Sequence, residues 1–181
     1  FRHILQGWDH LLFLICLMAL ARMPRKVFWA VTGFTIGHSF TLAAASLKIL
    51  TLPVIYVETL ISLSIILVCV ELLHTGRKTI ARTYPVLISL FFGLVHGLGF
   101  ANELISIGFP DDGLVAALLF FNLGVEAGQL AFVVPVMLLA FVVQRYIGSA
   151  RHLSETIGYK YVFYTIGLVA CFWFVERSLQ F

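Results

Sequence analysis

Charged side chains are scarce in this sequence. Asp, Glu, Lys and Arg make up 12% of the 181 residues, whereas hydrophobic residues make up 61%. A soluble domain carries charge on about a quarter of its residues. The mean hydropathy of +1.01 points the same way, and the chain has neither a long polar tail nor a low-complexity tract. These absences exclude a soluble core. We therefore predict a single integral membrane domain over residues 1–181, built as an all-α helical bundle.

Other absences narrow the range of functions. The net charge of +3 is too small to indicate binding to nucleic acid. Cys16, Cys69 and Cys171 stand singly in apolar runs without a C-x-x-C pair, and we interpret them as small apolar residues. The sequence has no ATP-binding motif. Any pumping would therefore need an ion gradient or an accessory protein.

Long apolar runs dominate what is present. A membrane-spanning helix needs about 20 mostly apolar residues. The runs predict helices over residues 4–21, 27–47, 53–74, 85–105, 114–146 and 159–175. The run 114–146 is either one long helix, tilted or bent near Pro135, or two shorter ones. We predict six transmembrane helices, or seven if this run divides.

Basic residues are confined to alternate predicted loops. The first, third and fifth loops are basic, whereas the second carries only Lys48 and the fourth carries Glu103, Asp111 and Asp112. Cytoplasmic loops of membrane proteins carry an excess of Lys and Arg. We therefore predict that the odd loops are cytoplasmic and that both termini face outside.

Ionisable side chains recur in five of the apolar helices at a similar predicted depth. They fall in the outer half of the membrane or near its midplane, and they are His3, Asp9, His10, His38, Glu58, His96 and Glu126. A charged side chain at the membrane centre costs about 2.5–3.5 kcal/mol. Several such groups at one depth predict that they meet and compensate one another. By contrast, His74 and His152 lie at the predicted cytoplasmic ends, and we interpret them as interfacial.

Small and polar residues accompany these groups. Gly93, Gly97 and Gly99 surround His96, and small residues let helices approach closely in lipid. We therefore expect His96 to point into a tight bundle interior. Other polar side chains stand near the histidines and carboxylates, most of them at helical spacing; they are Ser39, Ser62, Asn122 and Gln129.

Two or three imidazoles combined with carboxylates suit a borderline transition-metal ion such as nickel, zinc or cobalt. Sites for hard cations are richer in oxygen ligands. The pattern therefore favours a divalent transition-metal ion over calcium or magnesium. The alternative is that each histidine forms hydrogen bonds within the bundle and that each glutamate is protonated.

Five segments resemble, in the same order, the successive signatures of the HupE/UreJ family of membrane proteins. The segments are HILQGWDHLLFLICL, FTIGHSFTLA, VETLISLSI, FGLVHGLGFA and FNLGVEAGQL. They cover roughly residues 3–130, and the sixth predicted helix carries no such signature. The resemblance implies a permease for nickel, or for nickel and cobalt, associated with hydrogenase and urease gene clusters. The family motif maps onto His3, Asp9, His10, His38, Glu58, His96, Asn122, Glu126 and Gln129.

The leading prediction is a transition-metal permease, for nickel first, in the bacterial inner membrane. Its ligands would be the neutral imidazoles of His10, His38 and His96. Carboxylates would balance the charge or orient an imidazole, and they are Asp9, Glu58 and Glu126. The polar lining would comprise His3, Ser39, Ser62, Asn122 and Gln129.

The rival prediction is an intramembrane zinc-dependent hydrolase. Three histidines and an aspartate could hold zinc with an activated water in the open position, and Ser39 or Glu58 could serve the reaction. The cytoplasmic half of the bundle is poor in polar groups, which favours this rival. A metal sensor or a structural metal site is a third reading. In each case the predicted partners are the lipid bilayer and the metal ion, with a homo-oligomer or an accessory protein left open.

Overall fold

The computed structural model describes residues 7–50, 52–74, 79–107, 114–146 and 151–180. Over these residues the chain is all-helical, without a strand. The helices are α2 (Trp8–Ala21), α3 (Pro24–Ser46), α4 (Val54–Leu73), α5 (Ile80–Thr83), α6 (Pro85–Ile107), α7 (Leu114–Tyr146) and α8 (Arg151–Ser178). The predicted all-α fold is confirmed. Each of the six predicted helices corresponds to one helix of the structure, and α5 is a single turn before α6.

Prolines and one unusual backbone angle explain several helix boundaries. Arg22, whose φ is 59°, reverses the chain after α2. Pro24 occupies the first turn of α3, where its missing N–H has no helical partner to lose. This helix therefore begins at Pro24 rather than at residue 27. Pro135 lies inside α7, which is one continuous helix, so the structure has the first of the two predicted forms.

Four helices are long and apolar enough to cross a membrane. They cover Pro24–Ser46, Val54–Leu73, Ala116–Val142 and Gly158–Ser178, and shorter apolar helices cover Trp8–Ala21 and Pro85–Gly99. The 14 residues of α2 span about 21 Å, less than the hydrocarbon thickness of about 30 Å. Six spans and outward-facing termini therefore stay predictions.

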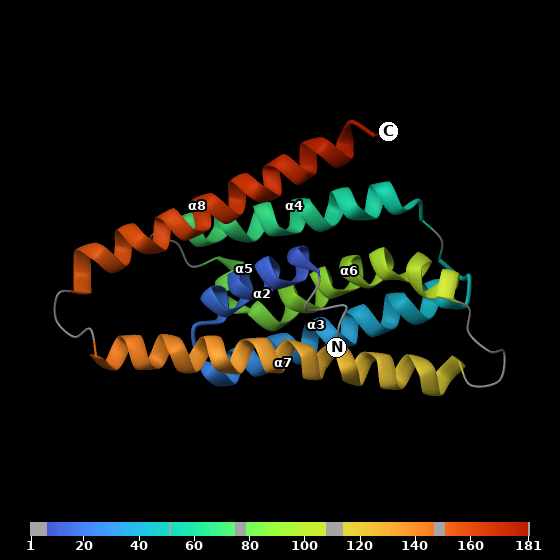
Figure 1. Cartoon of the computed structure of the whole chain (residues 1–181), viewed down its shortest axis with the longest axis horizontal. Helices are drawn as coiled ribbons and strands as arrows, with labels where there is room; N and C mark the ends of the chain where they lie inside the picture. Colours follow the sequence, from blue (N-terminus) through green and yellow to red (C-terminus); the bar gives the residue numbers. More distant parts are fainter. Residues whose placement is uncertain (1–6, 51, 75–78, 108–113, 147–150, 181) are drawn as a thin grey trace.

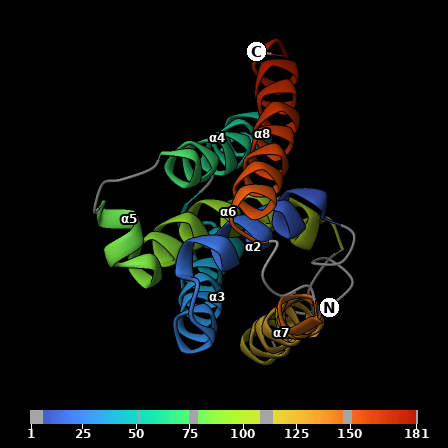
Figure 2. The same ribbon diagram turned by 90° about the vertical axis from the view of Figure 1, so that its left-hand side faces the viewer.

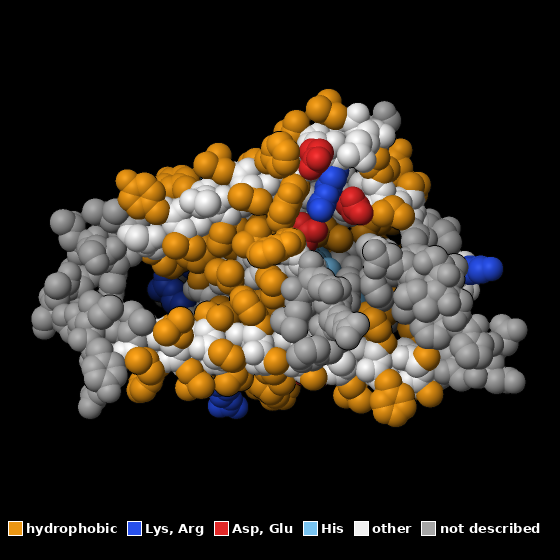
Figure 3. Space-filling view, in the orientation of Figure 1, with side chains coloured by type: hydrophobic (Ala, Val, Ile, Leu, Met, Phe, Trp, Pro, Cys, Tyr) orange, Lys and Arg blue, Asp and Glu red, His pale blue; other side chains and the backbone are white. Residues whose placement is uncertain are grey.

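The long helices run roughly side by side, with α7 and α8 on opposite outer sides (Figure 1). Seen from one end, α4 and α8 form a pair, and α2 lies in the middle of the bundle (Figure 2). The helix α2 contacts α3, α4, α5, α6 and α7, whereas α8 packs mainly against α4. Much of the surface is apolar, and acidic and basic side chains gather at one place on an otherwise largely hydrophobic face (Figure 3).

The most extensive packing joins α3 and α6, which run parallel. Small residues recur at every fourth position on both helices: Gly33, Gly37 and Thr41 on α3, and Ser89, Gly93 and Gly97 on α6. A Cβ atom at Gly37 would overlap the backbone of α6, and one at Gly93 would overlap the backbone of α3. Such residues let helix backbones approach closely in lipid. This contact sets the relative positions of His38 and His96.

Candidate functional site

Three of the predicted ligands meet in the bundle interior. His10 of α2, His38 of α3 and His96 of α6 are here called the histidine cluster. The ring centroids of His10 and His96 are 5.0 Å apart, and those of His10 and His38 are 6.3 Å apart. His38 and His96 are 0% exposed and His10 is 7% exposed. His96 therefore lies in the tight interior that its flanking glycines predicted.

Phenylalanine rings form the walls around the histidine cluster. The ring of His96 lies 5.0 Å from that of Phe13 and 5.1 Å from that of Phe34, measured between centroids. The ring of His38 stacks against Phe34 on α3 and Phe121 on α7. Apolar walls exclude water and lower the local dielectric constant, which strengthens any interaction between an imidazole and an ion.

Ser64 of α4 orients the ring of His96. The Ser64 hydroxyl donates to the backbone oxygen of Ile61 at 2.6 Å, and its oxygen lies 3.0 Å from His96 Nε2. A hydroxyl has one hydrogen to donate. In the tautomer that carries its hydrogen on Nε2, His96 donates to Ser64, which in turn donates to Ile61, and the imidazole lone pair is on Nδ1. A neighbouring side chain often fixes the tautomer of a metal-binding histidine in this way.

The spacing of the rings can be compared with that of a metal site. A ligating nitrogen lies about 2.0–2.1 Å from the metal, which places two tetrahedrally arranged ring centroids about 5 Å apart. The His10–His96 separation of 5.0 Å fits this value. The His10–His38 separation of 6.3 Å is longer. Among the described residues, no three His, Cys, Asp or Glu side chains form a group that could hold a metal. A site with all three imidazoles would require His38 to approach.

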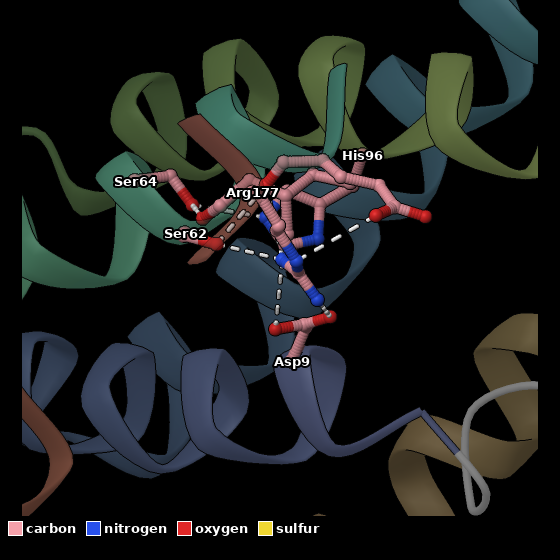
Figure 4. A network of polar contacts seen from close by, with 7 residues as sticks. Asp9, Ser62, Ser64, His96 and Arg177 are labelled. Atoms are coloured by element: carbon pink, nitrogen blue, oxygen red, sulfur yellow. Dashed lines mark hydrogen bonds and ion pairs between the residues drawn. The ribbon is translucent and has the colours of Figure 1, made fainter. Parts of the chain in front are cut away.

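Beside the histidines, a guanidinium group lies between two carboxylates (Figure 4). Nη2 of Arg177 on α8 donates to Asp9 Oδ2 at 2.9 Å, and Nη1 donates to Ser62 Oγ at 2.6 Å and to the backbone oxygen of Glu58 at 3.0 Å. Nε of Arg177 is 3.6 Å from Glu58 Oε2. The ring of Trp173 lies 5.6 Å from the guanidinium carbon. Asp9, Glu58, Ser62 and Arg177 are here called the arginine cluster.

The arginine cluster gives Asp9 and Glu58 a partner other than the predicted one. The sequence predicts that these carboxylates compensate a metal ion or an imidazole, whereas in the structure they face Arg177. The side chains are 22% exposed for Asp9, 46% for Glu58 and 17% for Arg177. One signal was available in the sequence. Arg177 follows the last apolar run at the predicted outer end, where basic residues are depleted.

The polar residues of α7 face α3 rather than the histidine cluster. Glu126 Oε1 accepts a hydrogen bond from Thr32 Oγ1 at 2.9 Å, and Gln129 Oε1 accepts one from Thr35 Oγ1 at 2.9 Å. Glu126 and Gln129, three residues apart on α7, therefore face the same neighbouring helix. Thr32 precedes His38 by six residues, about 9 Å along the helix axis. Glu126 thus lies displaced from the histidine cluster toward the predicted cytoplasmic side.

The remaining predicted lining residues have local partners or lie elsewhere. Ser39 Oγ donates to the backbone oxygen of Thr35 at 2.6 Å, and Asn122 Nδ2 donates to that of Leu118 at 2.8 Å. Both bonds are within their own helices. Ser62 belongs to the arginine cluster. His3 lies outside the described residues.

Comparison with known proteins connects this arrangement to one family. The model of the HupE / UreJ protein family matches residues 1–177. This match is wider than the five signature segments, and it includes α8 up to Arg177. Comparisons with curated proteins and with solved structures returned no match. The family match and the four long apolar helices identify an integral membrane protein that lies in a lipid bilayer. The chain belongs to the HupE/UreJ family, which is known for its association with nickel and cobalt transport.

Proposed function

We propose that this protein is a permease for a divalent transition-metal ion, with nickel as its principal cargo, in the bacterial inner membrane. The observation that carries the proposal is the meeting of three buried imidazoles from three helices of an integral membrane protein. Buried ionisable groups within a membrane are costly and therefore mark functional pathways. Imidazole nitrogen suits nickel, cobalt and zinc, and the family's association with nickel and cobalt transport supports the first two.

In this proposal the histidine cluster supplies the ligands. His10 and His96 have the spacing of two ligands on one ion, and His38 completes the site when its ring moves closer. Ser64 keeps the lone pair of His96 on Nδ1. Protons and metal ions compete for imidazole nitrogen, so metal occupancy falls when the solution is acidified.

The carboxylates act at two positions along the proposed path. On the predicted outer side, Asp9 and Glu58 carry two negative charges against the single positive charge of Arg177. The arginine cluster therefore keeps a net negative charge, which attracts a cation. On the other side of the histidines, Glu126 offsets part of the charge of the dication. The side chains of His3, Ser39, Ser62, Asn122 and Gln129 are proposed to line this path.

The hydrolase is not carried forward as a second function. Its proposed reaction groups were Ser39 and Glu58. In the described part of the chain, Ser39 donates to a carbonyl of its own helix and Glu58 is paired with Arg177. Neither contact prepares a nucleophile or a general base beside the histidine cluster.

Uptake into liposomes tests the permease. The purified protein is reconstituted, and the entry of nickel is measured for the wild type, for His38→Gln and for the matched control His74→Ala. His74 is an exposed residue at the end of α4. We expect uptake by the wild type and the control but not by His38→Gln, with circular dichroism confirming that all three proteins are folded. If one zinc ion per chain survives dialysis and no nickel crosses the membrane, the protein is not a permease.

A further inference from the structure

Two cysteines that stand far apart in the sequence touch in the structure. Cys16 of α2 and Cys69 of α4 have their Sγ atoms 3.6 Å apart. Both are free thiols, and they are 0% and 2% exposed. The sequence alone predicts only single small apolar residues, because the two cysteines stand in separate apolar runs, 53 residues apart, without a C-x-x-C pair. Their convergence makes a pair of sulfur donors that neither residue provides alone.

The thiol pair is separate from the histidine cluster. Cys16 follows His10 by six residues on α2, which is about 9 Å along the helix axis. Cys69 follows Ser64, the partner of His96, by five residues on α4, which is about 7.5 Å. Both displacements point toward the predicted cytoplasmic side. The surroundings are apolar, because the two cysteines belong to the same buried cluster as Leu17, Leu20, Ile65, Val68, Leu72, Phe163, Ile166 and Ala170.

A glycine of α8 faces the thiol pair. A Cβ atom at Gly167 would lie 3.6 Å from Cys69 Cβ and 4.0 Å from its Sγ. These are ordinary contact distances, so the glycine leaves about one methyl group of room beside the sulfur. A larger side chain at this position would fill that room.

We propose that Cys16 and Cys69 form a two-sulfur site for a soft monovalent metal ion of the copper(I) class. Thiolate ligands select soft ions such as copper(I), whereas imidazole suits borderline divalent ions. A sulfur–metal bond of about 2.3 Å, the value for zinc thiolates, lets one ion bridge two sulfur atoms up to about 4.6 Å apart. The observed 3.6 Å is about 1 Å shorter, so the two sulfur atoms would move apart to hold the ion in the linear geometry of two-coordinate copper(I).

The number of donors favours the same class of ion. Structural zinc sites have four protein ligands. Among the described residues, no group of three or more His, Cys, Asp or Glu side chains could hold a metal. The pair therefore suits an ion that is satisfied by two sulfur atoms. This site goes beyond the proposed permease function and does not depend on it.

The protonation balance also suits an apolar site. Copper(I) replaces the proton of one thiol, and that proton leaves to the solvent, while the second thiol donates a lone pair through sulfur. The bound unit, one thiolate, one thiol and one monovalent ion, has no net charge. A neutral unit avoids the cost of leaving a charge in a low-dielectric interior.

Anaerobic titration of the purified full chain in detergent with copper(I) tests the proposal, with bicinchoninate as the competing chelator. We expect one copper(I) ion per chain and a new near-ultraviolet absorption from the copper–sulfur bond. Cys16→Ala and Cys69→Ala should weaken copper(I) binding by more than about 100-fold. Losing a ligand costs more affinity than losing a residue that hydrogen-bonds to a ligand, which already costs about 10–100-fold. Cys171→Ala is the matched control, since Cys171 is the exposed cysteine of α8, and it should bind like the wild type.

A reversible oxidation tests the same site in the wild-type protein, without a substitution that could disturb folding. Diamide takes two electrons and two protons from the two thiols and forms a disulfide between them, and dithiothreitol reverses this step. Copper(I) binding by the wild type should disappear on oxidation and return on reduction. Equal copper(I) affinity in the wild type and in both single alanine variants would overturn the proposal, as would unchanged binding by the oxidised protein.

Discussion

Asp9 and His10 are neighbours in the sequence, yet α2 presents them to two different environments. Successive residues of a helix point about 100° apart. His10 faces α3 and α6, where it joins two further imidazoles among phenylalanine rings. Asp9 faces α8, where it meets a guanidinium. The histidine cluster gathers imidazole nitrogens among apolar rings, whereas the arginine cluster gathers carboxylates around a guanidinium.

This difference bears on how the two regions meet a metal ion. In the histidine cluster, imidazole nitrogens lie in a buried apolar space. The low dielectric constant there strengthens the attraction between each nitrogen and a dication. In the arginine cluster, Arg177 already compensates part of the carboxylate charge, and the side chains are partly exposed. An ion arriving there must compete with the guanidinium. We therefore expect the first region to bind the ion and the second to attract it.

The largest effect is expected from a substitution that disrupts the histidine cluster and leaves the arginine cluster in place. Gly93→Ala places a Cβ atom against the backbone of Phe34, so α3 and α6 must separate. Overpacking of this kind costs about 1–3 kcal/mol. Thermal unfolding in detergent should show a lower midpoint and nickel binding should be lost, while the arginine cluster between α2, α4 and α8 stays in place.

Gly158→Ala is the matched control for this change. A Cβ atom at Gly158 meets nothing within 4 Å, and alanine favours a helix over glycine by about 0.5–1 kcal/mol. The control should unfold at the same temperature as the wild type or slightly above it. Equal midpoints for the two variants would contradict the close approach of α3 and α6.

Nickel affinity separates the two regions next. His96→Asn removes a proposed ligand, so its nickel dissociation constant should rise by more than about 100-fold. Asp9→Asn removes only a neighbouring charge, and its dissociation constant should rise by at most about 10-fold. Isothermal titration of both variants in detergent measures the difference. A larger loss for Asp9→Asn would exchange the roles assigned to the two clusters.

A smaller effect, on the free energy of unfolding, is expected when Arg177 is removed. Arg177→Ala leaves Asp9 and Glu58 facing each other without their partner, and hydrogen bonds to charged groups contribute about 1.5–3 kcal/mol. Because the side chains are partly exposed, the loss in unfolding free energy should lie near about 1 kcal/mol. Chemical unfolding in detergent compares this variant with Arg25→Ala, an exposed arginine at the start of α3. An unchanged free energy for Arg177→Ala would mean that the ion pairs contribute nothing.

The helices were predictable because each is a long apolar run bounded by local signals. Pro53 marks a predicted helix start, and the run from residue 114 continues through Pro135 as a single helix, whereas α3 begins at Pro24, three residues before the predicted start. The beginning of α8 at Arg151 was not predicted, because the helix extends into a polar segment that hydropathy does not identify. Hydropathy therefore predicts the apolar part of each helix, whereas the polar first turns of α8 carry no such signal.

The meeting of the three histidines could be predicted from the sequence, whereas the partners of the carboxylates could not. Ionisable side chains are rare in membrane-spanning helices, so those that occur are candidates for a functional site. This is why the sequence predicts His10, His38 and His96 as site residues. Their partners lie on other helices, and a single sequence does not reveal which helices touch. Arg177 as the partner of Asp9 and Thr32 as the partner of Glu126 follow only from the packing.

X-ray absorption at the nickel edge tests the central claim most directly, because it identifies the atoms bound to the ion. The wild type loaded with one equivalent of nickel should show imidazole nitrogen among its ligands, and the imidazole contribution should decrease in His10→Asn. Asp9→Asn, studied under the same conditions, should give the spectrum of the wild type. A nickel spectrum without imidazole, or one that changes in Asp9→Asn but not in His10→Asn, would contradict the assignment of the ion to the histidine cluster.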